Sequence, residues 1–408
     1  MPPESAVELG LMTGVPPFPS DSQVTLANWQ DPPYNRWGFQ HVRELIPTAN
    51  ISRGLGKPWV LQRAERDLDG LALSIGGRRL IDFPAFLDET YTDGILVLHR
   101  GKVVLERYLN GMRPDTTHLL MSVSKSVTSA ACGSLVADGV LSPADLVTRH
   151  IPELAGTSWD GCTVRHLLDM RAGTKFNEDY DDLTAEVRVY EQIYLWRPRV
   201  DLTLPTDMTA YFRLLQNQSE HGGVFDYRSV LTDMLGWVME RASGIRLPEL
   251  ISRSVWQPMG AEFDAEITVD AHGNAMADGG VCATLRDLAR FGQVLLGDGR
   301  RGTTTVIPRS WLDDTLTPEP DSRAAFEASE DQKGLPETAY YRNQFWIIDP
   351  KAPIFQCSGI NGQTVFVHGP TKTVVAKLST WPVAWGAPFA AMTRLGLTSL
   401  AEQLAASG

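Results

Sequence analysis

The stretch HLLMSVSKS, residues 118–126, holds the pattern on which the interpretation of this chain depends. Apolar side chains recur every four positions behind it as far as Gly139, which predicts an amphipathic helix over residues 122–138 with a glycine after its last turn. Residues three apart lie on the same face of a helix, so we expect the Lys125 amine within reach of the Ser122 hydroxyl. Ser122 would then lie in the first helical turn.

A serine and a lysine placed in this way can act as a nucleophile and its base. A serine hydroxyl is a weak nucleophile at neutral pH and needs a group that accepts its proton. A lysine can be that group if burial lowers its pKa, and the N–H groups at the start of a helix suit a developing oxyanion. The pattern also occurs by chance in helices, but a single lysine among Ser, Thr, Ala and Val favours a chemical role. We therefore predict Ser122 as nucleophile and Lys125 as general base.

Two further motifs could complete such a site. The stretch FDYRS, residues 225–229, precedes a predicted helix over 231–242, and its Tyr227 could place a phenol over the pair and relay a proton to the leaving group. The stretch GINGQ, residues 359–363, opens a β-rich run, where glycines allow a close approach and the Ile360 N–H could bind the oxyanion. An ordinary core tyrosine and an ordinary strand-entry turn remain the alternatives.

The order of the predicted elements indicates an α+β fold. Strands near both ends of the chain surround a helical middle, which predicts one antiparallel sheet assembled from distant segments, flanked by helices, with a mostly helical domain inserted. The elements predicted outside the motifs are the hairpins 95–98/103–105 and 364–368/373–378 and the helices 284–296 and 388–406.

This order also predicts the domains. We expect a discontinuous α/β domain formed by residues 1–120 and 340–408, in which residues 1–35 are an irregular arm pinned by aromatic side chains. A mostly helical domain would comprise residues 121–339. The active site is expected between the two domains.

Composition argues against several classes of function. The 408 residues carry a formal net charge of -12, from 49 acidic against 37 basic residues, and such a surface repels nucleic acids and anionic membranes. Some of the acidic groups could instead line a pocket for a cationic substrate. The sequence lacks a G-x-S-x-G elbow, an H-E-x-x-H motif and a phosphate-binding glycine loop, so we expect no cofactor and no metal.

The cysteines and the apolar segments bear on the compartment. The four cysteines are scattered without a C-x-x-C pair, which argues against a zinc site and against a disulfide framework. No apolar stretch long enough for a transmembrane helix is present. Glu4 and Glu8 lie where a signal peptide would have a basic and then an apolar segment. We expect a cytoplasmic protein.

The stretch 118–126, together with WQDPPYNRW at residues 29–37, resembles the 6-aminohexanoate-dimer hydrolases and related carboxylesterases. These enzymes form a branch of the serine β-lactamase, or penicillin-recognising enzyme, superfamily. The shorter similar stretches are NEDY at 177–180, GGV at 279–281 and RDLAR at 286–290. The similarity covers nearly the whole chain.

The chain departs from the superfamily at two motifs. In the class C-like branch the second motif is Tyr-x-Asn and the third is Lys-Thr-Gly. This chain has YRS at residues 227–229 and ING at residues 360–362. These departures argue against a true β-lactamase, whose third-motif lysine helps to bind the substrate carboxylate.

The resemblance implies a serine β-lactamase-like fold and roles for particular residues. Ser122 would be the nucleophile, Lys125 the general base and Tyr227 the proton relay. The backbone N–H groups of Ser122 and Ile360 would form the oxyanion hole. The predicted substrate-binding residues are a tyrosine on a closing loop, an aromatic pocket wall, two acids that could pair with the ammonium end of an aminoalkanoate, and an amide of the third motif: Tyr180, Trp346, Glu191, Asp278 and Asn361.

The predicted function is hydrolysis of a linear amide of the 6-aminohexanoate-dimer type, of short-chain carboxylic esters, or of both, through an acyl-enzyme. A β-lactamase or D-amino-acid peptidase relative and a non-catalytic binding module on the same fold remain alternatives. The expected partner is a small amide or ester substrate, with neither nucleic acid nor membrane, and a homodimer is left open. Glu191 and Asp278 could equally be solvated surface acids.

Overall fold

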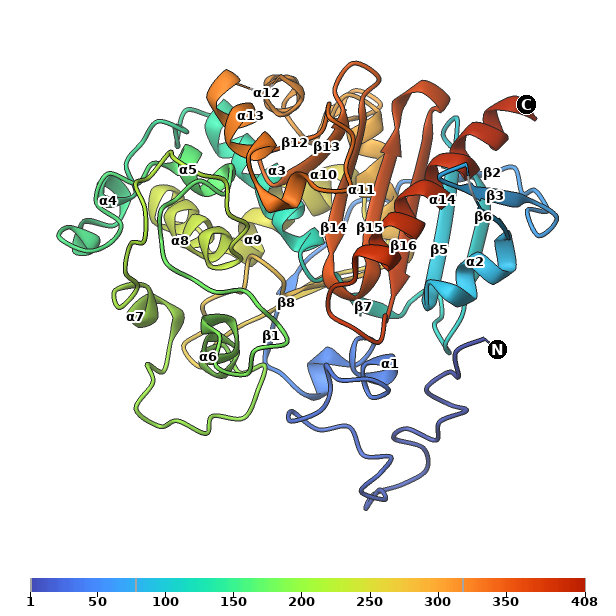
Figure 1. Ribbon diagram of the computed structural model, residues 1–408, viewed down its shortest axis with the longest axis horizontal. Coiled ribbons are helices and arrows are strands. Elements are labelled where there is room, and N and C mark those ends of the chain that lie inside the picture. Colours follow the sequence, from blue (N-terminus) through green and yellow to red (C-terminus); the bar gives the residue numbers. More distant parts are fainter. Residues whose placement is uncertain (1, 78, 318, 408) are drawn as a thin grey trace.

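A large sheet built from both ends of the chain dominates the computed structural model, which describes residues 2–77, 79–317 and 319–407 (Figure 1). Its eight strands are ordered β12-β13-β14-β15-β16-β5-β6-β2, and all neighbours are antiparallel except the short pair β2–β6. The α+β class and both predicted hairpins are confirmed. The strands are β2 (Gln62–Arg63), β5 (Thr92–His99), β6 (Lys102–Tyr108), β12 (Tyr340–Arg342), β13 (Phe345–Asp349), β14 (Ile354–Gly359), β15 (Gln363–His368) and β16 (Thr373–Ser379).

The two ends of the chain meet at the pair β16–β5. Val375 of β16 lies opposite Val97 of β5, and in Figure 1 the red strand lies beside the cyan one. Every residue of β5 and of β16 is buried, because helices cover both faces of the sheet. This pairing joins segments more than 270 residues apart and completes the sheet predicted from the sequence.

Helices cover the two faces of the large sheet. Helices α2 (Phe83–Glu89) and α14 (Ala387–Ala406) bury one face, where Phe86, Val97 and Leu400 belong to one hydrophobic cluster. Helix α11 (Leu285–Leu296) packs on the other face against β5, β15 and β16. The approach is close: a Cβ atom at Gly292 would lie 2.5 Å from Val374 Cγ1.

A second sheet of four strands leads into the motif around Ser122. Its order is β1-β8-β9-β7, and all its pairs are antiparallel. Two separate two-stranded pairs complete the strands of the described chain. The strands of these sheets are β1 (Thr48–Ile51), β7 (Thr117–Leu119), β8 (Ala265–Thr268) and β9 (Val281–Thr284), with the pairs β3 (Ala72–Ile75)/β4 (Arg79–Asp82) and β10 (Arg300–Arg301)/β11 (Thr304–Thr305).

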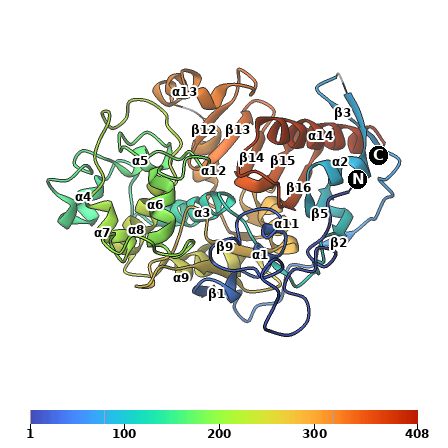
Figure 2. The ribbon, with the colours of Figure 1, turned by 60° about the horizontal axis from the view of Figure 1, so that its bottom comes forward.

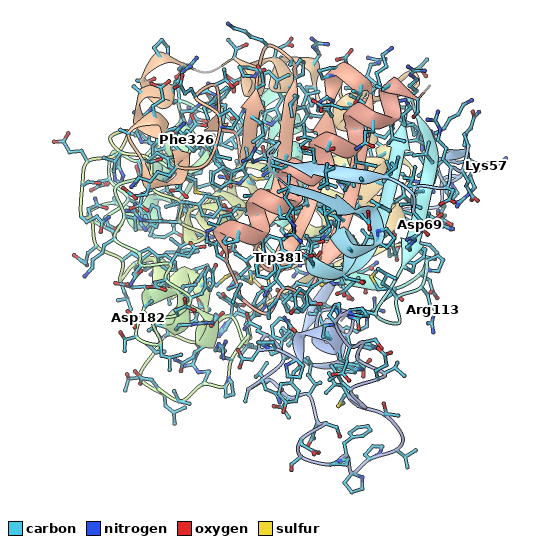
Figure 3. All side chains as sticks on the ribbon, turned by 45° about the vertical axis from the view of Figure 1, so that its right-hand side comes forward. Lys57, Asp69, Arg113, Asp182, Phe326 and Trp381 are labelled. Atoms are coloured by element: carbon cyan, nitrogen blue, oxygen red, sulfur yellow. The ribbon has the colours of Figure 1, made fainter. Side chains whose placement is uncertain are left out.

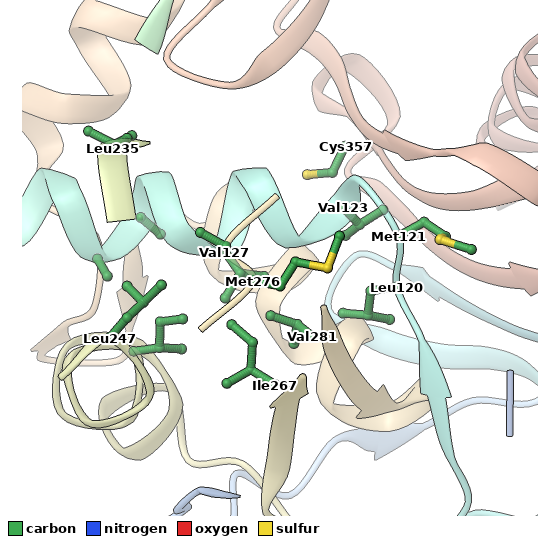
Figure 4. Close-up of a cluster of buried hydrophobic side chains, with 14 of the residues drawn as sticks. Leu120, Met121, Val123, Val127, Leu235, Leu247, Ile267, Met276, Val281 and Cys357 are labelled. Carbon is green, nitrogen blue, oxygen red and sulfur yellow. The ribbon is translucent and has the colours of Figure 1, made fainter. Parts of the chain in front are cut away.

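Helix α3 (Val123–Ala137) runs through the middle of the molecule. It packs on α8 (Val230–Ser243), α9 (Leu247–Ile251) and β14, and Figure 4 shows apolar side chains from several elements gathered around it. The remaining helices are α1 (Asn35–Gly38), α4 (Val147–His150), α5 (Val164–Leu168), α6 (Glu186–Ile193), α7 (Met208–Phe212), α10 (Gln257–Met259), α12 (Arg309–Leu316) and α13 (Pro320–Glu327). Short helical turns cover Val42–Glu44, Pro152–Leu154, Ser252–Trp256, Glu330–Gln332, Ile360–Gly362 and Gly369–Thr371.

The N-terminal segment is largely irregular and is held by aromatic and charged contacts. The Trp29 indole is fully buried, and its Nε1 donates to the Trp196 carbonyl at 2.7 Å. Arg36 pairs with the buried Asp93 of β5 at 2.8 Å. Figure 2 brings this side of the molecule forward and shows the blue arm in front of the body. The arm therefore contacts both the helical region and the large sheet.

No helix among residues 2–77, 79–317 and 319–407 is both long and apolar enough to span a membrane.

Candidate active site

A strained turn presents Ser122 at the start of α3. Met121, directly before it, has φ 48°, a left-handed conformation that non-glycine residues rarely adopt and that is enriched at functional sites. The Leu120 N–H donates to the Val281 carbonyl at 2.8 Å, which fixes the turn to β9. Ser122 is the residue before the first helical one, so its own N–H points out of the helix without an intrahelical partner.

The Lys125 amine reaches the Ser122 hydroxyl. Its Nζ lies 2.9 Å from Ser122 Oγ, as the spacing of three in a helix predicts. The same Nζ donates to Ser229 Oγ at 2.9 Å and to the Asp278 main-chain oxygen at 3.0 Å. The lysine side chain is only 1% exposed, which places an amine with three polar contacts in a dry environment.

The expected lowering of the Lys125 pKa is wrong. Burial does act to lower this pKa, but the interactions with Tyr227 and with the carboxyl groups of Asp278, Glu178 and Asp233 outweigh burial and raise it. Among these groups, the Asp278 carboxylate forms an ion pair with the lysine, with its Oδ2 3.8 Å from Lys125 Nζ. Lys125 is therefore held in its charged form until something reduces the surrounding negative charge.

Tyr227 lies beside the pair, as predicted. The centre of its ring is 5.2 Å from Lys125 Nζ, and it stacks on Trp346 with ring centroids 5.5 Å apart. Burial raises the pKa of Tyr227, while Lys125 and hydrogen bonding with Ser122 act in the opposite direction. The phenol is thus protonated at neutral pH and able to donate a proton.

Gly359 allows the third motif to approach the serine. A Cβ atom at this position would lie 2.6 Å from the Leu120 oxygen and 2.9 Å from the Ser122 nitrogen. The end of β14 therefore contacts the turn at Ser122, and Ile360 follows directly, with Asn361 in a left-handed conformation at φ 57°. This contact puts the two predicted N–H groups on neighbouring segments.

A cavity opens beside Ser122. Its empty volume is about 360 Å³, part of it open to solvent. Its lining combines aromatic rings with two carboxylates and the groups around the serine. The lining includes Ser122, Tyr180, Tyr190, Glu191, Tyr194, Trp196, Ser229, Asp278 and Ile360.

The two predicted acids both line this cavity, but their carboxylates differ in the partners they have. Glu191 is 1% exposed and already paired with two arginines, Arg188 at 2.9 Å and Arg197 at 2.7 Å. Asp278 is 4% exposed, and its Oδ1 has no hydrogen-bond partner in the described part of the chain. Both are buried, so the alternative of solvated surface acids is wrong for both. Asp278 differs from Glu191 in having one carboxylate oxygen without a hydrogen-bond partner in the described residues, while its other oxygen lies 3.8 Å from Lys125 Nζ.

The other predicted substrate-binding residues differ in their placement. Tyr180 lines the cavity and donates its hydroxyl hydrogen to Glu178 at 2.8 Å. Trp346 packs behind Tyr227 and is not among the described residues that line the cavity. Asn361 also lies outside that lining, because its side-chain amide donates to the carbonyls of Trp381 and Val383. Trp381, labelled in Figure 3, stacks in turn on Phe389 of α14.

Sequence reasoning missed three polar residues around Lys125. Ser229 accepts from Lys125 and donates to Glu178 at 2.6 Å, and Asp233 accepts the Asp278 N–H at 3.0 Å. Glu178 and Ser229 belong to the stretches NEDY and FDYRS, in which the sequence assigned roles only to Tyr180 and Tyr227. Their contacts with Lys125 join distant parts of the chain, so no local spacing could have indicated them.

No group of three or more His, Cys, Asp or Glu side chains in the described ranges is arranged to hold a metal ion. The polar groups of the site surround an amine instead.

The comparisons with known proteins agree with this geometry. The family model described as "Beta-lactamase" matches residues 85–395. The 6-aminohexanoate-dimer hydrolase of Paenarthrobacter ureafaciens is 38% identical over 366 residues, which cover 90% of each chain. Esterase EstB of Burkholderia gladioli is 33% identical over 156 residues, 36% of this chain and 38% of that one. A solved structure from Bacillus anthracis, provisionally assigned as a 6-aminohexanoate-dimer hydrolase, has a TM-score of 0.85 at 26% identity and covers 95% of this chain and 98% of its own.

Proposed function

Because the chain belongs to the β-lactamase family and is a serine hydrolase, we propose that it cleaves small amides and esters through an acyl-enzyme on Ser122. The observation that carries this proposal is the 2.9 Å contact between Lys125 Nζ and Ser122 Oγ inside a buried polar cluster. Once it is neutral, an amine at this distance can accept the hydroxyl proton directly. The named relatives, an amide-dimer hydrolase and an esterase, support both substrate classes.

The acylation step follows from the placement of the three side chains. Ser122 Oγ attacks the substrate carbonyl carbon while its proton passes to Lys125, and the C=O electrons move onto the carbonyl oxygen. The N–H groups of Ser122 and Ile360 stabilise that oxyanion. When the intermediate collapses, the bond to the leaving amine or alcohol breaks, and the leaving group takes the Tyr227 proton. Tyr227 regains a proton from Lys125, and water then releases the acid by the reverse sequence.

We propose further that the amide substrate carries a cationic end, which Asp278 binds. A buried carboxylate oxygen without a partner is costly, and an ammonium group in the cavity would satisfy it. The aromatic lining suits a cation as well, since ring faces attract positive charge. Glu191 is less suited to this role, because two arginines already compensate it, and we assign it to holding this wall of the cavity.

Charge in the bound state would also help the base. The Asp278 carboxylate is one cause of the raised pKa of Lys125. A substrate ammonium paired with that carboxylate would offset its effect, so the pKa of Lys125 would fall and the neutral amine would become available. In this scheme an aminoalkanoate amide of the 6-aminohexanoate-dimer type activates its own hydrolysis.

The remaining predicted residues have supporting roles in this proposal. Tyr180 contacts the substrate from the loop before α6, and Trp346 acts through Tyr227, on which it stacks. Asn361 holds the segment that carries the Ile360 N–H, because its side-chain amide donates hydrogen bonds to two main-chain carbonyl oxygens. The reaction would take place between the discontinuous α/β domain, residues 1–120 and 340–408, and the helical domain, residues 121–339.

We propose the cytoplasm as the compartment. All four cysteines are buried and unpaired, which suits a reducing environment. A homodimer remains a proposal that sedimentation of the purified protein would test.

The decisive experiment is to find the acylated residue. We expect intact-protein and peptide mass spectra, taken during turnover of a p-nitrophenyl ester, to show one acyl group on Ser122. Ser122→Ala should lose both adduct and turnover while it keeps its circular dichroism spectrum. Ser134→Ala, the same change further along α3, is the matched control and should keep both. An adduct on another residue, or turnover by Ser122→Ala, would remove Ser122 from this role.

The same protein separates the alternatives. Nitrocefin turnover comparable to that of the aminohexanoate dimer would favour a β-lactamase or peptidase relative. The absence of any adduct with ester, amide or nitrocefin would favour a non-catalytic binding module.

A further inference from the structure

The side chain of Glu178 reaches the catalytic lysine through one intervening hydroxyl. Its Oε1 accepts from Ser229 Oγ at 2.6 Å, and its Oε2 accepts from the Ser229 N–H at 2.5 Å. Ser229 Oγ lies in turn 2.9 Å from Lys125 Nζ. Both carboxylate oxygens are therefore engaged by a single residue, which holds Ser229 in one orientation.

This arrangement fixes the direction of each hydrogen bond. A serine hydroxyl has one hydrogen to donate. In Ser229 that hydrogen is donated to Glu178, so towards Lys125 the hydroxyl can only accept. The third contact of the amine is the Asp278 carbonyl oxygen, which also can only accept. Lys125 must therefore donate hydrogens to both.

These two donations decide where the lone pair of a neutral lysine points. A neutral amine has two hydrogens and one lone pair. If the hydrogens go to Ser229 and to the Asp278 carbonyl, the lone pair faces the one remaining contact, Ser122 Oγ at 2.9 Å. Without a fixed acceptor at Ser229, the amine could rotate and place a hydrogen towards Ser122 instead.

We propose that Glu178 is a positioning residue that aims the lone pair of Lys125 at Ser122, by making Ser229 an acceptor. The inference rests on the proposed role of Ser122 and Lys125. Glu178 itself is not among the described residues that line the cavity, so it acts through Ser229 and not on the substrate.

Glu178 also connects Lys125 to the wall of the cavity through hydrogen bonds. Tyr180, which lines the cavity, donates its hydroxyl hydrogen to the same Oε1 at 2.8 Å. Glu178 and Tyr180 both belong to the segment between α5 and α6. The lone pair of the base is therefore aimed only while this segment lies against the helix that begins after Ser229.

The titratable groups around the pair set the expected pH dependence. Tyr227, Asp278, Glu178 and Asp233 face Lys125, and each raises its pKa. Loss of the negative charge at Glu178 removes one of these effects, so the pKa of Lys125 falls. The acid limb of the rate profile, which reports loss of the Lys125 proton, must then move to lower pH.

Glu178→Gln tests the proposal with almost no change in shape. The Ser229 N–H needs an acceptor, so the amide oxygen must take the place of Oε2 and the NH₂ group the place of Oε1. That NH₂ donates to Ser229 Oγ, which frees the serine hydrogen to turn towards Lys125 and occupy its lone pair. For p-nitrophenyl acetate we expect kcat to fall on the order of 100-fold, the scale of general-base catalysis, with KM unchanged. The acid limb should move to lower pH.

Asp181→Asn is the matched control. It removes one carboxylate from the same segment, at an exposed position without contact to Ser229, and should leave kcat and the pH profile as in the parent protein. In a Ser229→Ala background, Glu178→Gln should have no further effect on kcat, because the residue through which it acts is absent.

Three results would overturn the inference: an unchanged kcat, a fall in kcat with the acid limb unmoved, or a full additional loss in the Ser229→Ala background. Acyl transfer to Ser122 in the parent protein separates this outcome from failure of the proposed function. If Ser122 carries the adduct and Glu178→Gln behaves as the parent, only the role of Glu178 is lost.

Discussion

Asp278 contacts Lys125 in two ways: its main-chain oxygen lies 3.0 Å from Nζ, and its carboxylate Oδ2 lies 3.8 Å from the same atom. The first contact positions the amine and the second affects its charge. Since the other carboxylate oxygen, Oδ1, has no partner in the described chain and the residue lines the cavity, one side chain connects the substrate space to the base. In the proposed scheme, a cationic substrate bound at Asp278 would therefore also change the pKa of Lys125.

Asp278→Asn should discriminate between cationic and neutral substrates. Loss of a charge-assisted contact costs about 1.5–3 kcal/mol, so we expect KM for the aminohexanoate dimer to rise about 10- to 100-fold. KM for p-nitrophenyl acetate should change little. Because the carboxylate raises the pKa of Lys125, its removal should also move the acid limb of ester hydrolysis to lower pH. Steady-state kinetics from pH 5 to 9 would measure both effects.

Glu191→Gln is the counterpart to that variant. Glu191 pairs with Arg188 and Arg197. Its neutralisation leaves Arg188 without its carboxylate and Arg197 with only the more exposed Asp31, so it should lower the free energy of unfolding by about 3 kcal/mol. Urea titration would measure the loss. The ratio of the KM for the amide to the KM for the ester should stay near that of the parent protein. A selective loss of dimer binding would instead indicate that Glu191, and not Asp278, binds the cationic end of the substrate.

Tyr227→Phe should affect amides more than esters. An amine leaving group must be protonated as it departs, whereas a p-nitrophenolate leaves without a proton, and burial keeps the Tyr227 phenol protonated by raising its pKa. We expect kcat for the aminohexanoate dimer to fall by about 10²–10⁴ and kcat for p-nitrophenyl acetate to fall less. Tyr341→Phe removes a hydroxyl from the ring that packs on Tyr227 and is the control. Equal losses on both substrates in Tyr227→Phe would contradict the relay.

Gly359→Ala should disrupt the proposed oxyanion hole. The new methyl group would lie 2.6 Å from a backbone oxygen and 2.9 Å from the Ser122 nitrogen, neither of which is a flexible side-chain end. The strand must move away from the turn, so kcat should fall on the order of 100-fold, as when one oxyanion donor is removed. Overpacking of this kind should also cost about 1–3 kcal/mol of stability.

Gly56→Ala provides the control for that change. A Cβ atom at Gly56 meets nothing within 4 Å, so activity and melting temperature should match those of the parent protein. Full ester activity in Gly359→Ala would show that the approach of β14 to Ser122 is not needed.

Lys377→Met should change how stability depends on pH. Lys377 is buried on β16, donates to the Thr90 carbonyl at 3.2 Å, and has its pKa lowered by burial to about 7 from 10.5. Between these values the unfolded chain binds more protons than the folded one, so this lysine makes stability rise with pH across that window. The Met variant lacks this contribution.

The free energy of unfolding, measured in urea at pH 7, 8 and 9, checks this prediction. Relative to Lys377→Met, the parent protein should gain stability at each step. Parallel curves for the two proteins would mean that the buried amine has an ordinary pKa.

The pairing of Ser122 with Lys125 and the main elements around it could be predicted from local sequence. A separation of three residues in a helix determines that two side chains share a face, and apolar periodicity predicts the helix that carries them. The hairpin β5–β6 and the cap of α11 by Thr284 depend on neighbouring residues in the same way. These features need no knowledge of the rest of the chain.

The charge state of the site was decided only by the tertiary structure. Ser229 lies 104 positions from Lys125 and Asp278 lies 153 positions from it, and both reach the amine because separate loops converge on α3. A pKa depends on every charge and dipole within a few ångströms, whatever their separation in sequence. The sequence therefore determined which residues could react, and the folded arrangement determined how the lysine is held and which carboxylate oxygen has no hydrogen-bond partner in the described chain.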